Sequence, residues 1–292
     1  MFKSFFKKQS INFQRFSGNY ELVKIGAIKQ QAEYDRLKKE MLEKYPKNVA
    51  LFGKKVYSQT DEDGIIEEIF NRVPNNKSFL EIGIQTGTEC NTLYLLLKGW
   101  KGMWIEGNPK FCKKIENDLN GKKFKNKLLV VNSFVTKDNI TDLFMQAYNF
   151  FNATEIDLFS LDIDGNDYYI MEQLLKNSVF PKVVCVEYNG KFEPPLKIKI
   201  KYNKTQVWDW SDYLGCSLQS YVDLLETNYT LITCNITGIN AFFVRKDFAH
   251  LFESYSVQEQ YQPYRFYLSP ITLAQKPSLN YLRDQLEEFE KV

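Results

Sequence analysis

A run of apolar residues leads into an acid and two glycines in the stretch Ser78-Phe79-Leu80-Glu81-Ile82-Gly83-Ile84-Gln85-Thr86-Gly87-Thr88-Glu89. This order is typical of a strand that ends in a tight loop before a helix, the arrangement that holds a nucleotide-type cofactor in α/β proteins. The next apolar run, Met103-Trp104-Ile105, ends in Glu106. An acid roughly 20 residues after the glycines is placed to accept hydrogen bonds from both ribose hydroxyls of such a cofactor.

The spacing of the two glycines narrows the choice of cofactor. The pattern is E-x-G-x-x-x-G, without the further glycine that lets a helix N-terminus approach a pyrophosphate. A cofactor without phosphates, S-adenosylmethionine, fits this loop better. We therefore predict that Glu81 orients the cationic end of the cofactor and that Gly83 and Gly87 leave room for its amino-acid tail. The glycines alone also fit an ordinary tight turn, and Glu106 at the end of the next strand favours the cofactor.

Composition bounds the class of protein. The chain has 292 residues and a formal net charge of +2, which suits one large α/β domain with extensions and argues against nucleic acid as a partner. No apolar run reaches the ~18 residues of a membrane span, so none is predicted. Five scattered cysteines without a CxxC pair predict reduced core residues of a cytoplasmic protein. His250 is the only histidine, which argues against histidine triads and multi-histidine metal sites.

Alternating apolar runs predict the sheet. Seven strand-like runs occur, at residues 79–84, 103–105, 127–131, 157–163, 183–186, 230–233 and 241–244. Helix-sized segments separate most of them, which predicts a doubly wound, mostly parallel α/β sheet of the class I methyltransferase (Rossmann-like) type. The last two runs are too close for a crossover helix, so the last strand is predicted to be antiparallel, in a hairpin at the sheet edge. Right-handed crossovers then bring five polar strand ends to one rim: Glu81, Glu106, Asn132, Asp162 and Glu187.

Three segments are predicted along the chain. Residues 1–50 form an N-terminal helical extension, residues 51–250 the methyltransferase domain, and residues 251–292 a C-terminal tail or cap. Within the domain, residues 190–213 form a substrate-side insertion in which lysines alternate with aromatic residues. Such a loop suits an anionic, ring-containing substrate such as a nucleotide-linked or phosphorylated sugar. The predicted substrate contacts are Tyr168, Asn189, Lys191, Trp208 and Tyr213. A solvated lid without a ligand is the alternative.

The ends of the fourth and fifth runs carry the candidate catalytic residues. Asp162 and Asp164 follow the fourth run, and strand alternation sends both to one side, while Glu187 ends the fifth run. Three converging carboxylates repel each other unless a proton, a substrate cation or a metal intervenes. A divalent ion with oxygen ligands and a general base of raised pKa are both consistent with this cluster. Asp167 is predicted to cap the following helix.

Polar residues elsewhere complete the predicted cofactor site. Asn132 and Ser133 follow the third run, where the adenine would lie, and Asp162 faces the cofactor from the fourth. Upstream of the sheet, Gln59 and Asp63 stand in a loop that enters a helix and has more polar residues than a cap needs. We predict that both help to close the cofactor pocket.

Several motifs taken together resemble one family. They are Ser58-Gln59-x-x-Glu62-Asp63-Gly64-Ile65-Ile66, Phe79-Leu80-Glu81-Ile82-Gly83, Leu161-Asp162-Ile163-Asp164-Gly165-Asn166-Asp167-Tyr168-Tyr169, Val186-Glu187-Tyr188-Asn189, Tyr213-Leu214-Gly215-Cys216-Ser217-Leu218 and Gly238-Ile239-Asn240-Ala241-Phe242-Phe243-Val244-Arg245. Residues 57–245 thereby resemble the FkbM-like group of S-adenosylmethionine-dependent methyltransferases. The conjunction is more specific than any single motif.

The resemblance implies an activity and a second cofactor. Enzymes of this group are often associated with bacterial surface-glycan (capsule or lipopolysaccharide) or natural-product tailoring and act on sugar hydroxyls. Their macrocin O-methyltransferase-like relatives hold a divalent ion with acids at the ends of strands four and five. Asp164 and Glu187 match those places, and Tyr188 replaces, or Asn189 serves for, the second acid of the strand-five pair. The resemblance therefore implies a magnesium or manganese site at Asp164, Glu187 and Asn189.

These observations predict an S-adenosylmethionine-dependent O-methyltransferase that acts on a hydroxyl of a sugar or of a nucleotide-linked or phosphorylated small molecule. One alternative is a nucleotide-sugar-modifying enzyme that uses NAD, which the missing glycine and the absence of a Tyr-x-x-x-Lys pair near strand five disfavour. Another is a non-catalytic partner subunit with a methyltransferase fold. The sequence leaves open the acceptor and whether the chain forms a homo-oligomer.

Overall fold

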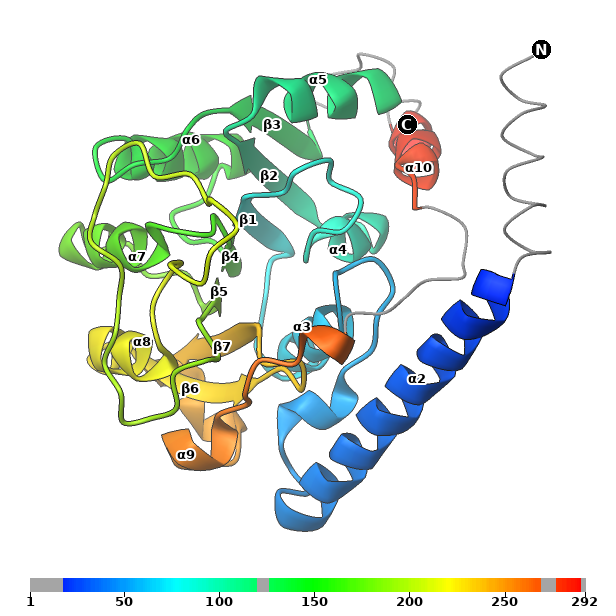
Figure 1. Cartoon of the computed structure of the whole chain (residues 1–292). Helices are drawn as coiled ribbons and strands as arrows, with labels where there is room; N and C mark the ends of the chain where they lie inside the picture. The colour runs from blue at the N-terminus through cyan, green and yellow to red at the C-terminus, as the bar shows by residue number, and fades with distance from the viewer. Residues whose placement is uncertain (1–17, 120–125, 269–276, 290–292) are drawn as a thin grey trace.

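A computed structural model describes residues 18–119, 126–268 and 277–289, and a seven-stranded sheet forms its centre (Figure 1). The sheet order is β3-β2-β1-β4-β5-β7-β6. The strands are β1 (Ser78–Ile82), β2 (Lys101–Glu106), β3 (Leu128–Asn132), β4 (Leu158–Leu161), β5 (Val183–Glu187), β6 (Tyr229–Cys234) and β7 (Asn240–Arg245). The first five are parallel, whereas β7 runs antiparallel to both β5 and β6. The predicted class I methyltransferase sheet, with its antiparallel hairpin at the edge, is confirmed.

Two strands end earlier than the apolar pattern predicts, and both do so at the polar rim. β1 ends at Ile82 because Gly83 turns the backbone to a φ of +87°. β4 ends at Leu161, ahead of a loop in which Asp164 adopts a φ of +54°. The left-handed region is uncommon for a residue other than glycine, so the loop after β4 has a specific shape.

Helices cover both faces of the sheet (Figure 1). One apolar core contains Phe79 of β1 and receives side chains from α3 (Glu62–Arg72), α4 (Leu93–Leu97), α5 (Pro109–Asp118) and α10 (Asn280–Phe289). The other contains the neighbouring Leu80 and receives side chains from α6 (Ile140–Phe151), α7 (Asp167–Lys176) and α8 (Leu218–Leu225). Adjacent residues of a central strand thus enter different cores, as expected for a sheet buried on both faces.

The segments outside the sheet pack onto the domain. The predicted N-terminal extension contains α2 (Gly18–Lys44), which is followed by the 3-10 helix η1 (Val49–Phe52). After the sheet come η2 (Lys246–Leu251), α9 (Val257–Gln260), η3 (Phe266–Leu268) and α10. The parts of the predicted extension and tail at 1–17, 269–276 and 290–292 lie outside the described residues. All five cysteines are free thiols. Among the helices of the described ranges, none combines the length and apolar character that crossing a membrane requires.

Candidate active site

The turn after β1 packs directly against the end of β4. A Cβ atom on Gly83 would overlap the backbone carbonyl oxygen of Asp162, and the Gly83 amide donates to the carbonyl of Ile105 at 3.0 Å. A Cβ on Gly87 would lie 2.9 Å from the ring of Trp104. Both glycines therefore make room for other parts of the protein. The structure shows this packing role. The predicted role of both glycines in making room for a cofactor tail stays a prediction.

Glu81 holds the start of α4. Its carboxylate accepts hydrogen bonds from the backbone amides of Asn91 and Thr92, at 2.8 and 3.1 Å, and from the hydroxyl of Thr92. The hydroxyl of Ser160 is a fourth donor, at 3.4 Å. Burial raises the pKa of Glu81 to about 7. Because both carboxylate oxygens are engaged, we expect Glu81 to act on a cofactor mainly by shaping the loop.

Glu106 ties the first loop to the end of β2. Its two carboxylate oxygens each accept a backbone hydrogen bond of 2.7 Å, one from Gln85 and one from Asn108. The Glu106 carbonyl accepts from the side chain of Asn132 at 2.8 Å and from the amide of Ser133 at 3.0 Å. The predicted cofactor residues at the ends of β2 and β3 are therefore in direct contact. A carboxylate can accept about four hydrogen bonds, so Glu106 retains capacity to accept a further one.

The two predicted residues upstream of α3 have different surroundings. Gln59 is exposed. Asp63 is buried, and one of its carboxylate oxygens accepts from three successive backbone amides, those of Val56, Tyr57 and Ser58. Asp63 therefore shapes the loop that enters α3. A cofactor contact by either residue stays a prediction.

The three predicted catalytic acids meet at the ends of β4 and β5. Carboxylate oxygens of Asp162, Asp164 and Glu187 all lie within 4.8 Å of one another. One oxygen of Glu187 is buried without a hydrogen-bond partner. No ion pair in the described part of the chain joins any of these three, which we call the acid cluster, to a lysine or arginine. A buried carboxylate without a partner is costly, so the cluster favours a bound proton or cation.

The pKa shifts agree with this reading. Burial raises the pKa of Asp162 well above its usual range, and the nearby charge of Asp164 raises it further. Burial likewise raises the pKa of Glu187, with the charge of Asp162 adding to the effect. The pKa of Asp164 is also raised by burial. Groups coupled in this way titrate together, so the acid cluster holds a proton more readily than three isolated carboxylates would.

The prediction that Asp167 caps α7 needs a correction. Asp167 is the first residue of α7, and Asn166 is at the N-cap position without a side-chain cap hydrogen bond. The carboxylate of Asp167 instead accepts from the backbone amides of Ile163 at 2.9 Å and Gly165 at 2.8 Å. These contacts reach back across the turn because its amides point toward α7. Asp167 therefore braces the turn that presents Asp164.

The insertion crosses the turn after β4. The side-chain amide of Asn166 donates to the carbonyl of Asn203 at 2.7 Å and its oxygen accepts from the Asn203 amide at 3.3 Å. At the base of the insertion, Asn189 donates to the carbonyls of Asp212 and Leu214 at 3.1 and 3.4 Å. Asn189 thus anchors the insertion, and its predicted roles in binding substrate or metal stay predictions.

Most lysines of the insertion already have a partner in the protein. Ion pairs join Lys191 to Asp212, Lys197 to Asp223 and Lys204 to Asp138. The ammonium of Lys199 lies 3.7 Å from the ring centroid of Tyr168, a cation–π contact. These partners balance much of the positive charge on which the prediction of an anionic substrate depended. The paired lysines include Lys191, the one lysine among the predicted substrate contacts.

The aromatic residues of the insertion are more accessible. The rings of Trp208 and Trp210 lie 4.6 Å apart, and the indole N–H of Trp208 donates to the carbonyl of Ser211 at 2.7 Å. Trp210 is 84% exposed and Tyr213 is 51% exposed. The hydroxyl of Tyr213 accepts from the backbone amide of Lys201 at 3.0 Å. The insertion therefore presents aromatic faces, which suit a ring with apolar edges better than a phosphate.

The sequence did not indicate a residue that the structure adds to this region, Tyr264. Its segment fits between two glycines: a Cβ on Gly190 would lie 2.9 Å from the Tyr264 amide, and a Cβ on Gly238 would overlap a carbonyl oxygen of the same segment. Burial raises the pKa of Tyr264, and the charges of Glu187 and Asp162 raise it further, so its phenol lies in the field of the acid cluster. The two glycines are the only sequence signal that could have pointed to it.

The sheet order, the glycine turn and the polar strand ends together define a class I methyltransferase fold. No protein-family model and no curated protein matches the chain. Among solved structures, the O-methyltransferase from Bacillus cereus in complex with SAH is 15% identical, with 77% of this chain and 100% of that chain covered, at a TM-score of 0.41.

Two further structures are similar at the same distant level. The glycopeptide N-methyltransferase MtfA complexed with S-adenosyl-L-methionine is 10% identical over 66% of this chain and 96% of that one, at a TM-score of 0.38. An S-adenosylmethionine-dependent methyltransferase from Clostridium acetobutylicum is 12% identical over 63% and 90%, at a TM-score of 0.37. Likenesses this distant do not bear on the reaction or substrate of this chain.

Proposed function

We propose that the chain is an S-adenosylmethionine-dependent methyltransferase that methylates a hydroxyl of a small sugar-type molecule. The observation that carries this proposal is the contact between Gly83 and the backbone of Asp162, which makes the glycine turn and the acid cluster parts of one surface. A cofactor held by the turn and by Glu106 would therefore lie beside three carboxylates. The motif resemblance supports a sugar hydroxyl in bacterial surface-glycan tailoring.

The residues fit the proposed cofactor and acceptor in kind. The Glu106 carboxylate retains capacity to accept a hydrogen bond from a ribose hydroxyl. Phe134, next along the chain from Ser133, exposes 45% of its surface near Gly107, where an adenine would stack. The pairing of Lys191, Lys197 and Lys204 within the protein favours an uncharged sugar over a phosphorylated one.

The chemistry that we assign to the acid cluster is proton removal and positioning. When bound, S-adenosylmethionine supplies an activated methyl group, and the chain's task is to align an acceptor oxygen with it and exclude water. A carboxylate with a raised pKa is, once deprotonated, a stronger base than an ordinary one. Glu187 has a buried oxygen without a partner and is our first choice to take the hydroxyl proton, with Asp164 as the second.

A divalent ion also fits the acid cluster. Three carboxylates with oxygens within 4.8 Å, without a lysine or arginine partner in the described ranges, form an oxygen-rich set of the kind that magnesium and manganese prefer. When bound, such an ion would lower the pKa of an acceptor hydroxyl. We assign it to Asp162, Asp164 and Glu187, and the role of Asn189 as a ligand stays a prediction.

Isothermal titration tests the proposal. The EDTA-treated protein is titrated with S-adenosylmethionine and S-adenosylhomocysteine, and then again with manganese present. We expect both nucleosides to bind, and manganese binding to be lost in Asp164→Asn but kept in Asp138→Asn. Asp138 is an exposed acid between β3 and α6 whose partner is Lys204. Absence of nucleoside binding would contradict the methyltransferase proposal. Equal manganese binding by both variants would remove the metal from it.

A further inference from the structure

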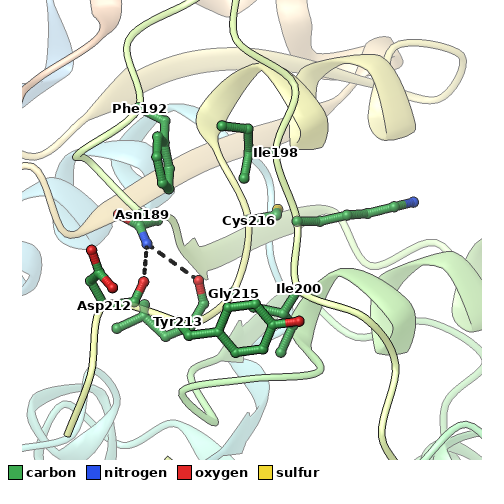
Figure 2. A pocket seen from close by; sticks show the side chains of 10 residues that line it. Asn189, Phe192, Ile198, Ile200, Asp212, Tyr213, Gly215 and Cys216 are labelled. Atoms are coloured by element: carbon green, nitrogen blue, oxygen red, sulfur yellow. Dashed lines mark hydrogen bonds between the residues drawn. The ribbon is translucent and has the colours of Figure 1, made fainter.

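A small pocket lies at the base of the insertion (Figure 2). Its volume is about 120 Å³. The residues that line it are Asn189, Phe192, Ile198, Lys199, Ile200, Asp212, Tyr213, Leu214, Gly215 and Cys216. Asn189 follows Glu187 by two residues, so the pocket borders the segment that directly follows β5.

The walls of the pocket are apolar with one polar end. Figure 2 shows Phe192 and Ile198 on one side, and Asn189 with Asp212 at one end. The amide hydrogens of Asn189 are used by backbone carbonyls, so this side chain is fixed. The side chain of Asp212 is 64% exposed and pairs with Lys191, which leaves its carboxylate reachable from solvent. The polar end can therefore accept a hydrogen bond, while the walls favour carbon atoms.

The volume limits what the pocket can hold. Ligand pockets for whole drug-sized molecules are roughly 300–1,000 Å³, whereas a cavity of about 150 Å³ lined by leucine, isoleucine and phenylalanine binds a benzene-sized group. The pocket at 120 Å³ fits a substituent of a few carbon-sized atoms and not a complete sugar ring. Ile198 is 40% exposed and Tyr213 is 51% exposed, so apolar surface would be covered when the pocket is filled.

We propose that this pocket is a specificity subsite that holds a small, mainly apolar substituent of the acceptor, of the size and polarity of an acetamido group. The methyl group lies between Phe192 and Ile198, and the amide N–H faces Asp212. The inference rests on the proposed function for its acceptor, and it adds a substrate class: acetamido sugars over plain sugars. It depends on the walls of the pocket alone and not on the transfer reaction.

Saturation-transfer NMR with N-acetylglucosamine and glucose as probes tests the inference, in the presence of S-adenosylhomocysteine. We expect the acetyl methyl protons to receive the strongest saturation in the wild-type protein and glucose to receive little. Ile198→Trp fills the pocket and should reduce the acetyl signal at least fivefold. Leu196→Trp adds the same bulk at a 52% exposed position that does not line the pocket, and it should leave the signal unchanged.

The outcomes separate this inference from the proposed function. No saturation of the acetyl methyl in the wild type, an equal response of glucose, or an unchanged signal in a folded Ile198→Trp would overturn the subsite. If circular dichroism shows that Ile198→Trp does not fold, Ile198→Phe replaces it, because phenylalanine fills the pocket with less bulk. The same acetyl signal is then measured. Titration of S-adenosylhomocysteine is run on the same samples. If the wild-type protein does not bind the nucleoside but still gives the acetyl signal, the methyltransferase proposal is rejected and the subsite proposal stands.

Discussion

Gly83 is the position at which the first loop and the acid cluster touch. It combines two demands, a left-handed backbone with a φ of +87° and a close approach of the Asp162 carbonyl. Gly99 shares the first demand, with a φ of +83°, but a Cβ atom added there would meet nothing within 4 Å. Comparing alanine substitutions at Gly83 and Gly99 therefore separates the cost of backbone strain from the cost of the steric contact.

We expect Gly83→Ala to lower the free energy of unfolding by at least about 2 kcal/mol, because the new Cβ forces the ends of β1 and β4 apart. Gly99→Ala should cost about 1 kcal/mol, the strain of the backbone alone. Urea unfolding followed by circular dichroism measures both. Equal losses in the two variants would show that the contact with Asp162 has little weight.

Glu106 is the residue whose effect on the cofactor can be tested most directly. Glu106→Gln removes the charge and leaves one side-chain oxygen, so one of the two backbone amides bonded to Glu106 loses its acceptor, and hydrogen bonds to charged groups contribute about 1.5–3 kcal/mol. We therefore expect the affinity for S-adenosylhomocysteine to fall at least tenfold by calorimetry. The control is Glu116→Gln, an exposed acid on α5. Unchanged affinity in Glu106→Gln would remove this residue from the cofactor site.

At the scale of elements, the insertion is joined to α7 by the side chain of Asn166. This side chain bonds both backbone groups of Asn203 and makes no cap hydrogen bond to its own helix. Its removal therefore weakens the attachment of the insertion, which the Tyr169 hydroxyl also holds through the carbonyl of Ile200, without removing a cap from α7. This separation makes the attachment of the insertion testable.

We expect Asn166→Ala to speed amide hydrogen exchange in residues 200–206 at least tenfold, because about 1.4 kcal/mol of local stability is lost. Exchange in β4 should stay at its wild-type rate. Asn177→Ala is the matched control, since the side chain of Asn177 donates to the carbonyl of Gln173 at the other end of α7. Equal exchange of residues 200–206 in both variants would contradict an anchoring role for Asn166.

The N-terminal helix is attached through a buried acid. The hydroxyl of Tyr34 in α2 donates to Asp61 at 2.9 Å, and the backbone amide of Ile236 is a further donor to the same oxygen. Burial raises the pKa of Asp61 to about 6. A carboxyl whose folded pKa lies above its unfolded value stabilises the fold when it is protonated. That contribution is complete below about pH 4 and is lost as the pH rises through about 6.

We therefore expect the melting temperature of the wild type, taken relative to Asp61→Asn, to fall between pH 4 and pH 7. The amide does not titrate, so the variant lacks this part of the pH dependence. Asp284→Asn, at a side chain that is 66% exposed, should follow the wild type. Scanning calorimetry in buffers of equal ionic strength measures the three proteins. A constant difference between the wild type and Asp61→Asn would contradict the assignment.

For the whole molecule, apolar periodicity predicted the sheet well because strands buried on both faces have continuous apolar runs. The convergence of Asp162, Asp164 and Glu187 was also predicted, since the ends of parallel strands meet at one rim, and the structure brings these three side chains together. The local roles of Glu81 and the other buried acids were less accessible, because they depend on where backbone amides point.

Contacts between distant segments were the least predictable part. Lys197 pairs with Asp223 on α8, and Lys204 pairs with Asp138 just before α6. Because both acids lie outside the insertion, its sequence alone predicts a larger net positive charge than the folded protein has there. Tyr264 belongs to a segment without strand or helix periodicity, and its place depends on the shape of a slot that two glycines form. Periodicity carries no information on either arrangement.

The segment that fills this slot comes late in the chain, which affects the order in which this region can assemble during synthesis. A ribosome delivers residues 262–264 after all seven strands, so a nascent chain can complete its sheet while the segment that fills this slot is still missing. Gly190 and Gly238 would lack their contacts with Pro263 and Tyr264 in that intermediate. Synthesis therefore reaches the seven strands before the segment that packs against these two glycines.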